Sequence, residues 1–366
     1  MALTAGIVGL PNVGKSTLFN AITQAGAEAA NYPFATIDPN VGIVEVPDAR
    51  LDKLTDMYQP KKTIPTTFEF TDIAGIVKGA SKGEGLGNKF LANIRQVDAI
   101  CHVVRCFDDE NITHVAGRVD PLDDIQTINL ELILADMETV EKRIVRVEKL
   151  AKQKNKEAQA EYEILTMLKE TFENELPART IEFNEEQQKI VKGFQLLTMK
   201  PVLYVANIGE NDVANGNNNK YVQQVQDFAK NDHAEVIVIC AKIEEEIAEL
   251  ESEEKAVFLQ ELGIQESGLD QMIRKAYHLL GLATFFTAGV QEVRAWTFKK
   301  GMKAPQCAGI IHSDFERGFI RAETVSYDDL VAYGSFNKAK EGGKVRLEGK
   351  DYIVRDGDIM HFRFNV

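Results

Sequence analysis

The feature that most constrains the fold is a glycine-rich turn near the amino terminus. Residues 9–16 are Gly-Leu-Pro-Asn-Val-Gly-Lys-Ser, which fits the pattern G-x-x-x-x-G-K-[ST]. The apolar run Ala5–Val8 before the turn predicts a strand, and the run KSTLFNAIT that starts at Lys15 predicts a helix. A strand, a glycine turn and a helix in this order direct backbone N–H groups at a phosphate. We therefore expect a P-loop.

The residues of this loop have separate expected tasks. The backbone around the phosphates is expected to come from four residues: Asn12, Val13, Gly14 and Thr17. Lys15 would supply positive charge to the β- and γ-phosphates, and the Ser16 hydroxyl would be a Mg²⁺ ligand. The sequence therefore predicts a nucleoside triphosphate with Mg²⁺ at this end of the chain.

A second motif lies at the end of the next expected strand. The run FEFTDIAG ends in the pattern D-x-x-G, where Asp72 can hold Mg²⁺ through water and the Gly75 amide can contact a γ-phosphate. Between the two motifs, the loop NYPFATIDPN contains Thr36, which could complete the Mg²⁺ and γ-phosphate contacts. An ordinary loop threonine is the alternative for Thr36. Placed one strand after a P-loop, Asp72 and Gly75 indicate a switch-type nucleotide hydrolase.

The segment that would read the base departs from the guanine pattern. After the expected strand Val202–Ala206, a guanine site would have Asn-Lys-x-Asp, and here stand Asn207, Ile208, Gly209 and Glu210. A longer acid and an isoleucine in place of lysine should spoil the paired hydrogen bonds to guanine, and unpaired polar groups disfavour GTP. We expect Asn207 to contact adenine, Ile208 to pack on its face, and the backbone of Cys240 and Ala241 to border it. A solvated loop acid is the alternative for Glu210.

Strand-like and helix-like segments alternate through residues 1–124 and again through 201–282. This alternation predicts an α/β, GTPase-like P-loop domain with a mainly parallel sheet covered on both faces. Its expected strands, besides Ala5–Val8 and Val202–Ala206, are Thr67–Thr71, Ala99–Val104 and Val236–Cys240.

The alternation stops between residues 125 and 200. Apolar residues recur there at steps of three and four from Leu130 to Ala151, and a second apolar stripe runs from Tyr162 to Phe172. The polar run KQKNKEAQ separates them. We predict an inserted antiparallel helical coiled-coil arm over 125–200. A helix pair packed on the sheet is the alternative.

The last part, residues 283–366, differs in pattern and in charge. Segments 286–298, 307–315 and 351–364 have strand chemistry, and Tyr327–Tyr333 is helical in pattern, which together predict a small mixed α/β module. This part carries 13 Lys+Arg against 11 Asp+Glu, whereas the rest carries 29 against 45. A less acidic module on an acidic protein suggests a different partner surface.

The chain shows no sign of a membrane segment or leader. Its longest apolar runs are far shorter than the ~20 residues that cross a bilayer, and no basic and apolar leader precedes the P-loop. We therefore expect a cytoplasmic protein without membrane association.

Across its whole length the sequence resembles the YchF/Obg-like ATPase family. The long matches include GLPNVGKST, NYPFATIDPN and AGIIHSDFERGFIRAE. The resemblance implies three parts: the P-loop domain (1–124 and 201–282), the coiled-coil arm (125–200) and a carboxy-terminal TGS domain (283–366). It also implies hydrolysis of ATP rather than GTP, and binding to the ribosome through rRNA or ribosomal protein.

The resemblance also assigns two residues of the reaction. Many switch GTPases place a glutamine after D-x-x-G to orient water, and here that position is Ile76, which cannot form a hydrogen bond through its side chain. The family likeness points instead to His114 as the catalytic residue. Asn12 resembles an asparagine that binds K⁺ in related proteins, and such an ion would offset charge between the phosphates.

Three other functions are compatible with parts of the sequence. Ile76 leaves room for a non-catalytic adaptor in which nucleotide only stabilises the fold. A GTPase of the Obg/Era type is a further alternative. A kinase fits least, because no second acid is recognisably placed to accept a substrate proton. The basic residues of the last module form a candidate ribosome contact or an exposed rim without a partner: Arg294, Lys299, Lys300, Lys303, Arg317 and Arg321.

Overall fold

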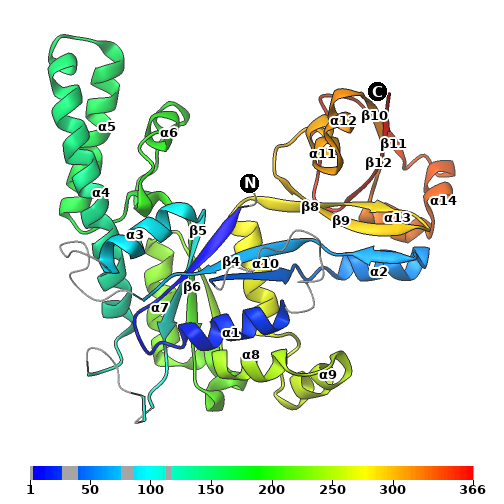
Figure 1. The fold of residues 1–366 in the computed structure, drawn as a ribbon, viewed down its shortest axis with the longest axis horizontal. Coiled ribbons are helices and arrows are strands. Elements are labelled where there is room, and N and C mark those ends of the chain that lie inside the picture. Colours follow the sequence, from blue (N-terminus) through cyan, green and yellow to red (C-terminus); the bar gives the residue numbers. More distant parts are fainter. Residues whose placement is uncertain (1–2, 27–39, 76–85, 110, 113–116, 366) are drawn as a thin grey trace. The chain divides into compact units, whose positions relative to one another are not determined.

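The computed structural model describes residues 3–26, 40–75, 86–109, 111–112 and 117–365 (Figure 1). The chain is divided into two compact units. The first unit contains Met1–Val44 and Glu69–Met272, and the second contains Glu45–Phe68 and Ile273–Val366. Each unit is built on its own six-stranded sheet.

The sheet of the first unit has the strand order β2-β4-β1-β5-β6-β7. β1 pairs in parallel with β4 and β5, and β5, β6 and β7 continue the parallel series. Every residue of β5 and β6 is buried, which requires cover on both faces of the sheet. This confirms the predicted α/β class. The strands are β1 (Thr4–Val8), β2 (Val41–Glu45), β4 (Thr67–Asp72), β5 (Ala99–Arg105), β6 (Val202–Asn207) and β7 (Glu235–Ile239).

The first unit also contains helices and 3-10 turns. α1 and α8 pack on each other, and α4 packs on α7 and β5. The helices are α1 (Lys15–Ala25), α3 (Leu86–Gln96), α4 (Pro121–Lys152), α5 (Lys156–Glu173), α6 (Glu185–Lys192), α7 (Lys220–Asn231), α8 (Ala241–Ala248), α9 (Ser252–Glu261) and α10 (Gly268–Leu279), which runs on into the second unit. The 3-10 turns are η3 (Ala178–Thr180), η4 (Leu197–Met199) and η5 (Glu210–Asn218).

α4 and α5 form a long antiparallel pair, which Figure 1 shows side by side. Ile133 and Val140 of α4 pack with Ile164 and Leu168 of α5 in one apolar cluster. The turn at residues 153–155 lies inside the polar run KQKNKEAQ, so the periodicity located both helices. Asp120 and Asn155 cap them, each accepting a hydrogen bond from the backbone N–H three residues later.

The base of this pair is held by buried charges. The Asp136 carboxylate of α4 accepts hydrogen bonds from the backbone N–H of Leu197 (2.9 Å) and Thr198 (2.8 Å) and from the Thr198 hydroxyl (2.7 Å). Arg179, after α5, donates to both carboxylate oxygens of Asp232 at the end of α7 (3.0 and 2.8 Å). Burial raises the pKa of Asp136, although its hydrogen bonds oppose that rise.

The second unit combines a carboxy-terminal sheet with a segment from early in the chain. Its strand order is β11-β10-β12-β8-β9-β3. Leu51 and Leu54 of α2 pack with Phe286 and Val293. The sequence analysis assigned this early segment to the P-loop domain. The elements are α2 (Ala49–Tyr58), β3 (Lys62–Ile64), β8 (Leu282–Ala288), β9 (Glu292–Lys299), α11 (Ala304–Ile311), α12 (Ser313–Arg317), β10 (Phe319–Ser326), α13 (Tyr327–Tyr333), α14 (Phe336–Glu341), β11 (Arg346–Glu348) and β12 (Asp358–Phe364).

One strand prediction in this unit is wrong. Residues 307–315 have strand chemistry, yet they lie in helices α11 and α12. Ala304, Cys307 and Ala308 are buried on one side of α11, at helical spacing, and Pro305 sits in its first turn. Small buried residues at this spacing favour a helix over a strand.

No helix in the described part of the chain is long and apolar enough to cross a membrane.

Candidate functional site

The P-loop joins the end of β1 to the start of α1. Two of its residues have left-handed backbone conformations, Asn12 with φ 64° and Gly14 with φ 93°. Val13 between them is buried, so it anchors the turn while its neighbours remain accessible. Turns of this kind direct backbone N–H groups inward, at the start of a helix. The backbone therefore has the conformation that the motif predicts, and phosphate binding at this turn stays a prediction.

Gly14 is constrained by its neighbour as well as by its backbone. A Cβ atom at this position would lie 2.2 Å from Nδ2 of Asn207. Left-handed backbone already disfavours other residues there. Both the backbone conformation and the contact with Asn207 therefore exclude a larger residue at position 14.

Asn207, the last residue of β6, ties three elements together. Its Nδ2 donates to the Val13 carbonyl (2.8 Å), and its Oδ1 accepts a hydrogen bond from the Ala241 backbone N–H (2.9 Å). The side chain thereby connects the P-loop, the end of β6 and the first turn of α8. Asn207 is only 4% exposed. The described contacts give this amide a role in positioning the loops of the site, and its expected contact with adenine stays a prediction.

Lys15 and Asp72 meet at the same edge of the sheet. Ile7 of β1 and Asp72 of β4 are register neighbours, and the Lys15 ammonium forms an ion pair with the Asp72 carboxylate. A Cβ atom at Gly75 would lie 3.4 Å from the Gly9 carbonyl oxygen, so Gly75 also lies beside the P-loop. The two sequence motifs therefore converge in space.

The donors at this edge fit a magnesium ion that is shared with a nucleotide. Ser16 is exposed in the first turn of α1, with Asp72 close to the neighbouring Lys15. In the described part of the chain, no group of three or more His, Cys, Asp or Glu side chains could hold a metal. Mg²⁺ at phosphate sites needs no such cluster, because it keeps several waters and binds phosphate oxygens. Thr36, the other expected ligand, lies outside the described residues.

The segment after Asn207 does not present the surface that the sequence analysis expected. Ile208 is only 4% exposed, and its Cδ1 would lie 2.8 Å from a Cβ at Gly216 of η5. This side chain therefore packs inside the protein, which argues against its stacking on a purine. Glu210 begins η5, and its carboxylate forms an ion pair with Lys242 (2.8 Å). Both side chains of this pair are about half exposed or more, at 47% and 61%.

Cys240 and Ala241 lie at the start of α8, beside Asn207. Cys240 is the N-cap residue of the helix, and the Ala241 N–H is the group bound by Asn207. Burial raises the pKa of the Cys240 thiol, so this side chain stays neutral at pH 7. Both residues thus lie next to Asn207, with the backbone N–H of Ala241 already engaged, and their expected contact with the base stays a prediction.

Arg105, at the end of β5, organises the loop that leads toward His114. The guanidinium is buried and donates to the carbonyls of Phe107 (3.1 Å) and Ile112 (3.0 Å). It also lies over the Phe107 ring, 4.6 Å from the centroid. In the sequence, the structural role of Arg105 is indicated only by its position as a charged residue at the end of an otherwise apolar strand. His114 and Ile76 lie outside the described residues.

The basic residues proposed for a ribosome contact fall into two groups. Lys303 and Arg317 form ion pairs with Asp351 and Asp314, and Arg294 lies over the Trp296 ring. Lys299, Lys300 and Arg321 are exposed. For these three, the described residues show no ion pair.

Comparison with known proteins adds family relationships to this geometry. Residues 4–208 match a family model described as "50S ribosome-binding GTPase", and residues 282–365 match a carboxy-terminal YchF-GTPase model described as a protein of unknown function. The chain is 76% identical to "Ribosome-binding ATPase YchF" of Bacillus subtilis. It is 54% identical to the protein of the same name from Escherichia coli O157:H7. Both matches cover the full length of this chain and of the relative.

A solved structure shows the same fold. It is described as that of the Schizosaccharomyces pombe YchF GTPase, and it matches with a TM-score of 0.89 at 40% sequence identity. The match covers 99% of this chain and 97% of the other.

Proposed function

Because this chain belongs to the YchF family, we infer that it is a ribosome-binding ATPase whose nucleotide state controls its binding to the ribosome. Nucleotide hydrolysis and ribosome binding follow from relatives named as ribosome-binding ATPases. The preference for ATP, the roles of individual residues and the control by nucleotide state are our proposals.

The observation that carries this function is the meeting of Lys15 and Asp72 at the P-loop. Lysine for the phosphates and a carboxylate for a metal-bound water are both needed in P-loop hydrolases, and here the two side chains already touch. We propose that nucleotide binding separates them, so that Lys15 turns to the β- and γ-phosphates. Asp72 and Ser16 would then hold Mg²⁺, with Thr36 as a further ligand. Such an ion would neutralise charge on the phosphate oxygens.

Hydrolysis also needs a group that orients water. Ile76 cannot do this through its side chain, so we propose His114, on the basis of the family resemblance. The contacts of Arg105 support the proposal, because its guanidinium holds the backbone carbonyls of Phe107 and Ile112, and Ile112 is two residues before His114 in the sequence. An imidazole can accept a proton or orient a water molecule at neutral pH.

We further propose that Asn12 binds K⁺ beside the phosphates. Its left-handed backbone, with φ 64°, and its exposure beside the phosphate turn support this role. A monovalent cation there would offset charge that develops between the β- and γ-phosphates. The prediction is faster hydrolysis in potassium than in sodium.

The preference for ATP rests on the base end of the site. Guanine recognition requires a carboxylate that accepts two hydrogen bonds from the base, and the Glu210 carboxylate is paired with Lys242. Breaking this pair to receive guanine would leave Lys242 without its partner, whereas adenine makes no such demand. The names of the relatives differ on this point, since the curated ones are called ATPases and the solved structure is called a GTPase.

The test is ATP hydrolysis, measured with and without 70S ribosomes in potassium and in sodium, for the wild type, His114→Ala and Lys15→Ala. We expect potassium to raise the rate, ribosomes to change it, and His114→Ala to lower it without weakening ATP binding. No turnover of the wild type under any condition would contradict the ATPase and favour an adaptor. A normal rate for His114→Ala would contradict only the role of that residue.

A further inference from the structure

Helix α9 carries apolar residues that its own fold does not cover. Residues 256–259 are Ala-Val-Phe-Leu, and four consecutive residues in a helix point in directions about 100° apart. They cannot all face the body of the unit. Ala256 and Val257 are exposed, with Val257 57% exposed, while Phe258 and Leu259 are partly buried. Part of this apolar surface therefore lies open to solvent.

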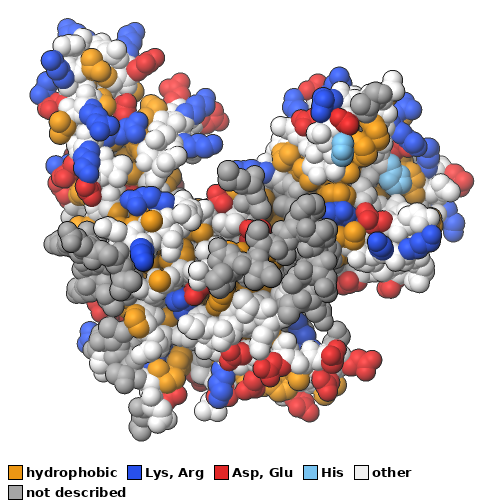
Figure 2. All heavy atoms as spheres, in the orientation of Figure 1, with side chains coloured by type: hydrophobic (Ala, Val, Ile, Leu, Met, Phe, Trp, Pro, Cys, Tyr) orange, Lys and Arg blue, Asp and Glu red, His pale blue; other side chains and the backbone are white. Residues whose placement is uncertain are grey.

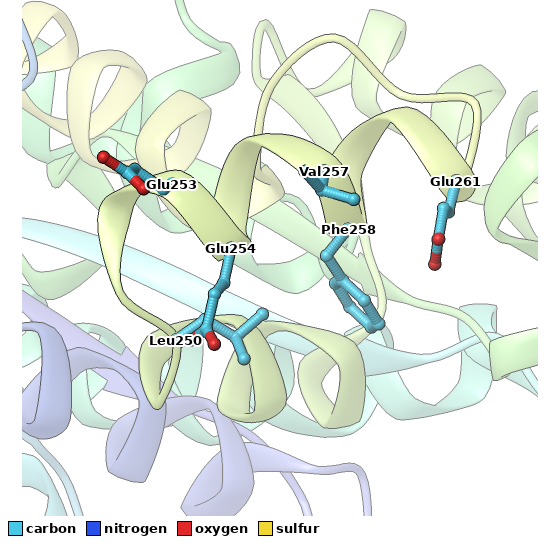
Figure 3. A pocket seen from close by; sticks show the side chains of 6 residues that line it. All are labelled: Leu250, Glu253, Glu254, Val257, Phe258 and Glu261. Carbon is cyan, nitrogen blue, oxygen red and sulfur yellow. The ribbon is translucent and has the colours of Figure 1, made fainter.

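The uncovered side of α9 borders a groove of about 400 Å³. Its lining consists of three apolar residues and three acids: Leu250, Val257, Phe258, Glu253, Glu254 and Glu261. Figure 3 shows Val257 and Phe258 in the middle of the helix, with Glu253 and Glu254 toward one end and Glu261 toward the other. The groove thus has an apolar centre between acidic ends.

The surroundings of this groove are strongly acidic. Residues 241–266 contain nine glutamates and two lysines. Both lysines already have acidic partners, since Lys242 pairs with Glu210 (2.8 Å) and Lys255 with Asp270 (3.0 Å). Within the described residues, Glu253 and Glu261 form no ion pair. Figure 2 shows acidic side chains gathered at the bottom of the view, where Figure 1 places α8 and α9.

We propose that this groove binds an amphipathic helix of basic character from a partner protein. The apolar centre would receive apolar side chains of that helix, which is the usual mode of binding in such grooves. The acidic ends would meet lysines or arginines about 12 Å apart, because Glu253 and Glu261 are eight residues apart at about 1.5 Å per residue. Nucleic acid is excluded as the occupant, since its phosphates would face these carboxylates.

This binding surface is separate from the phosphate and base contacts described above. None of the residues that line the groove contributes to the P-loop, to the Lys15–Asp72 pair or to the Asn207 contacts. The inference therefore does not depend on the proposed ATPase, and failure of either one leaves the other intact.

The test is a titration of the full chain with a fluorescent peptide of about 15 residues, near the length at which isolated helices become stable in water. The peptide carries leucines at i, i+3, i+4 and i+7 and lysines on the other positions. One control peptide replaces the lysines by glutamates, and a second scrambles the leucines so that no apolar face remains. Binding is followed by fluorescence anisotropy.

Two variants locate the binding on the groove. Val257→Asp places a charge in its centre, and the double variant Glu253→Lys with Glu261→Lys reverses the charge at its ends. The matched control is Val145→Asp, because Val145 lies on α4 of the arm and is 75% exposed. Thermal unfolding of each variant checks that the fold is retained.

We expect saturable binding of the basic peptide, which each groove variant weakens about tenfold or more and Val145→Asp leaves unchanged. Equal binding of the acidic or scrambled peptide would overturn the proposal, as would no binding at all or full binding by Val257→Asp. Sedimentation of the free protein tests a second copy as the occupant. A dimer that Val257→Asp dissociates would also overturn the proposal.

Discussion

The phosphate end and the base end of the nucleotide site are built in different ways. At the phosphate end, left-handed backbone at Asn12 and Gly14 and the buried Asn207 leave little freedom. At the base end, Glu210 and Lys242 form an ion pair that is largely open to solvent. Exposed pairs contribute only about 0–1 kcal/mol to stability. Phosphate binding is therefore tied to the fold, while the choice of base can change at little cost to the fold.

The largest effect is expected for Lys15→Ala. Removing the positive charge from the phosphates should lower single-turnover ATP hydrolysis about a hundredfold or more. Stability should change by about 1 kcal/mol or less, since the variant loses one partly exposed ion pair. The matched control is Lys242→Ala, which removes a lysine at the other end of the same site. Equal losses of rate in the two variants would contradict the comparison.

Gly14→Ala should reduce both stability and nucleotide affinity. Left-handed backbone and a contact of 2.2 Å with Asn207 together should cost about 2–4 kcal/mol. Gly209→Ala is the control, because Gly209 has φ −75° and the nearest atom to an added Cβ is 3.5 Å away. Urea unfolding measures the difference. If Gly14→Ala proves as stable as Gly209→Ala, the description of this turn is incorrect.

Asn207→Ala should cost about 2–3 kcal/mol, because it leaves the Val13 carbonyl and the Ala241 N–H without their side-chain partner. As a positioning residue, Asn207 should affect ATP and GTP alike, so both affinities should fall by a similar factor. Isothermal titration of the two nucleotides, with unfolding as the stability measurement, checks this. Loss of ATP binding alone, with GTP binding unchanged, would instead show direct adenine contact.

The smallest effect on stability is expected for Glu210→Ala. The pair with Lys242 is exposed, so the free energy of unfolding should change by less than about 1 kcal/mol. The ratio of ATP to GTP affinity should nevertheless fall, by about fivefold or less, since guanine no longer has to break the ion pair between Glu210 and Lys242. An unchanged ratio would move the source of the preference to another residue.

The same contrast separates what the sequence could predict from what it could not. The P-loop, the D-x-x-G motif and the heptad seam are local patterns, and the structure places β1, β4, α4 and α5 where those patterns predict them. The role of Asn207 depends on contacts with Val13 and Ala241, which are distant in sequence, so no local pattern reveals it. The burial of Ile208 beside Gly216 of η5 depends on equally distant contacts, so the sequence pattern alone does not predict it.

In the second unit, too, contacts between residues distant in the sequence decide features that local patterns do not predict. α2 and β3 follow β2 in the chain but pack on the carboxy-terminal sheet, and neither composition nor periodicity records that pairing. Residues 307–315 combine isoleucine and phenylalanine with small residues, which fits both a strand and a buried helix. The choice depends on the burial of Ala304, Cys307 and Ala308 against residues elsewhere in the chain.

The most direct test of the nucleotide site is a paired titration of the wild-type chain with ATP and GTP in the presence of Mg²⁺. The account predicts that ATP binds more tightly than GTP, by up to about fivefold, because guanine can be received only when the exposed pair between Glu210 and Lys242 is broken. Equal affinities, or tighter binding of GTP, would contradict it.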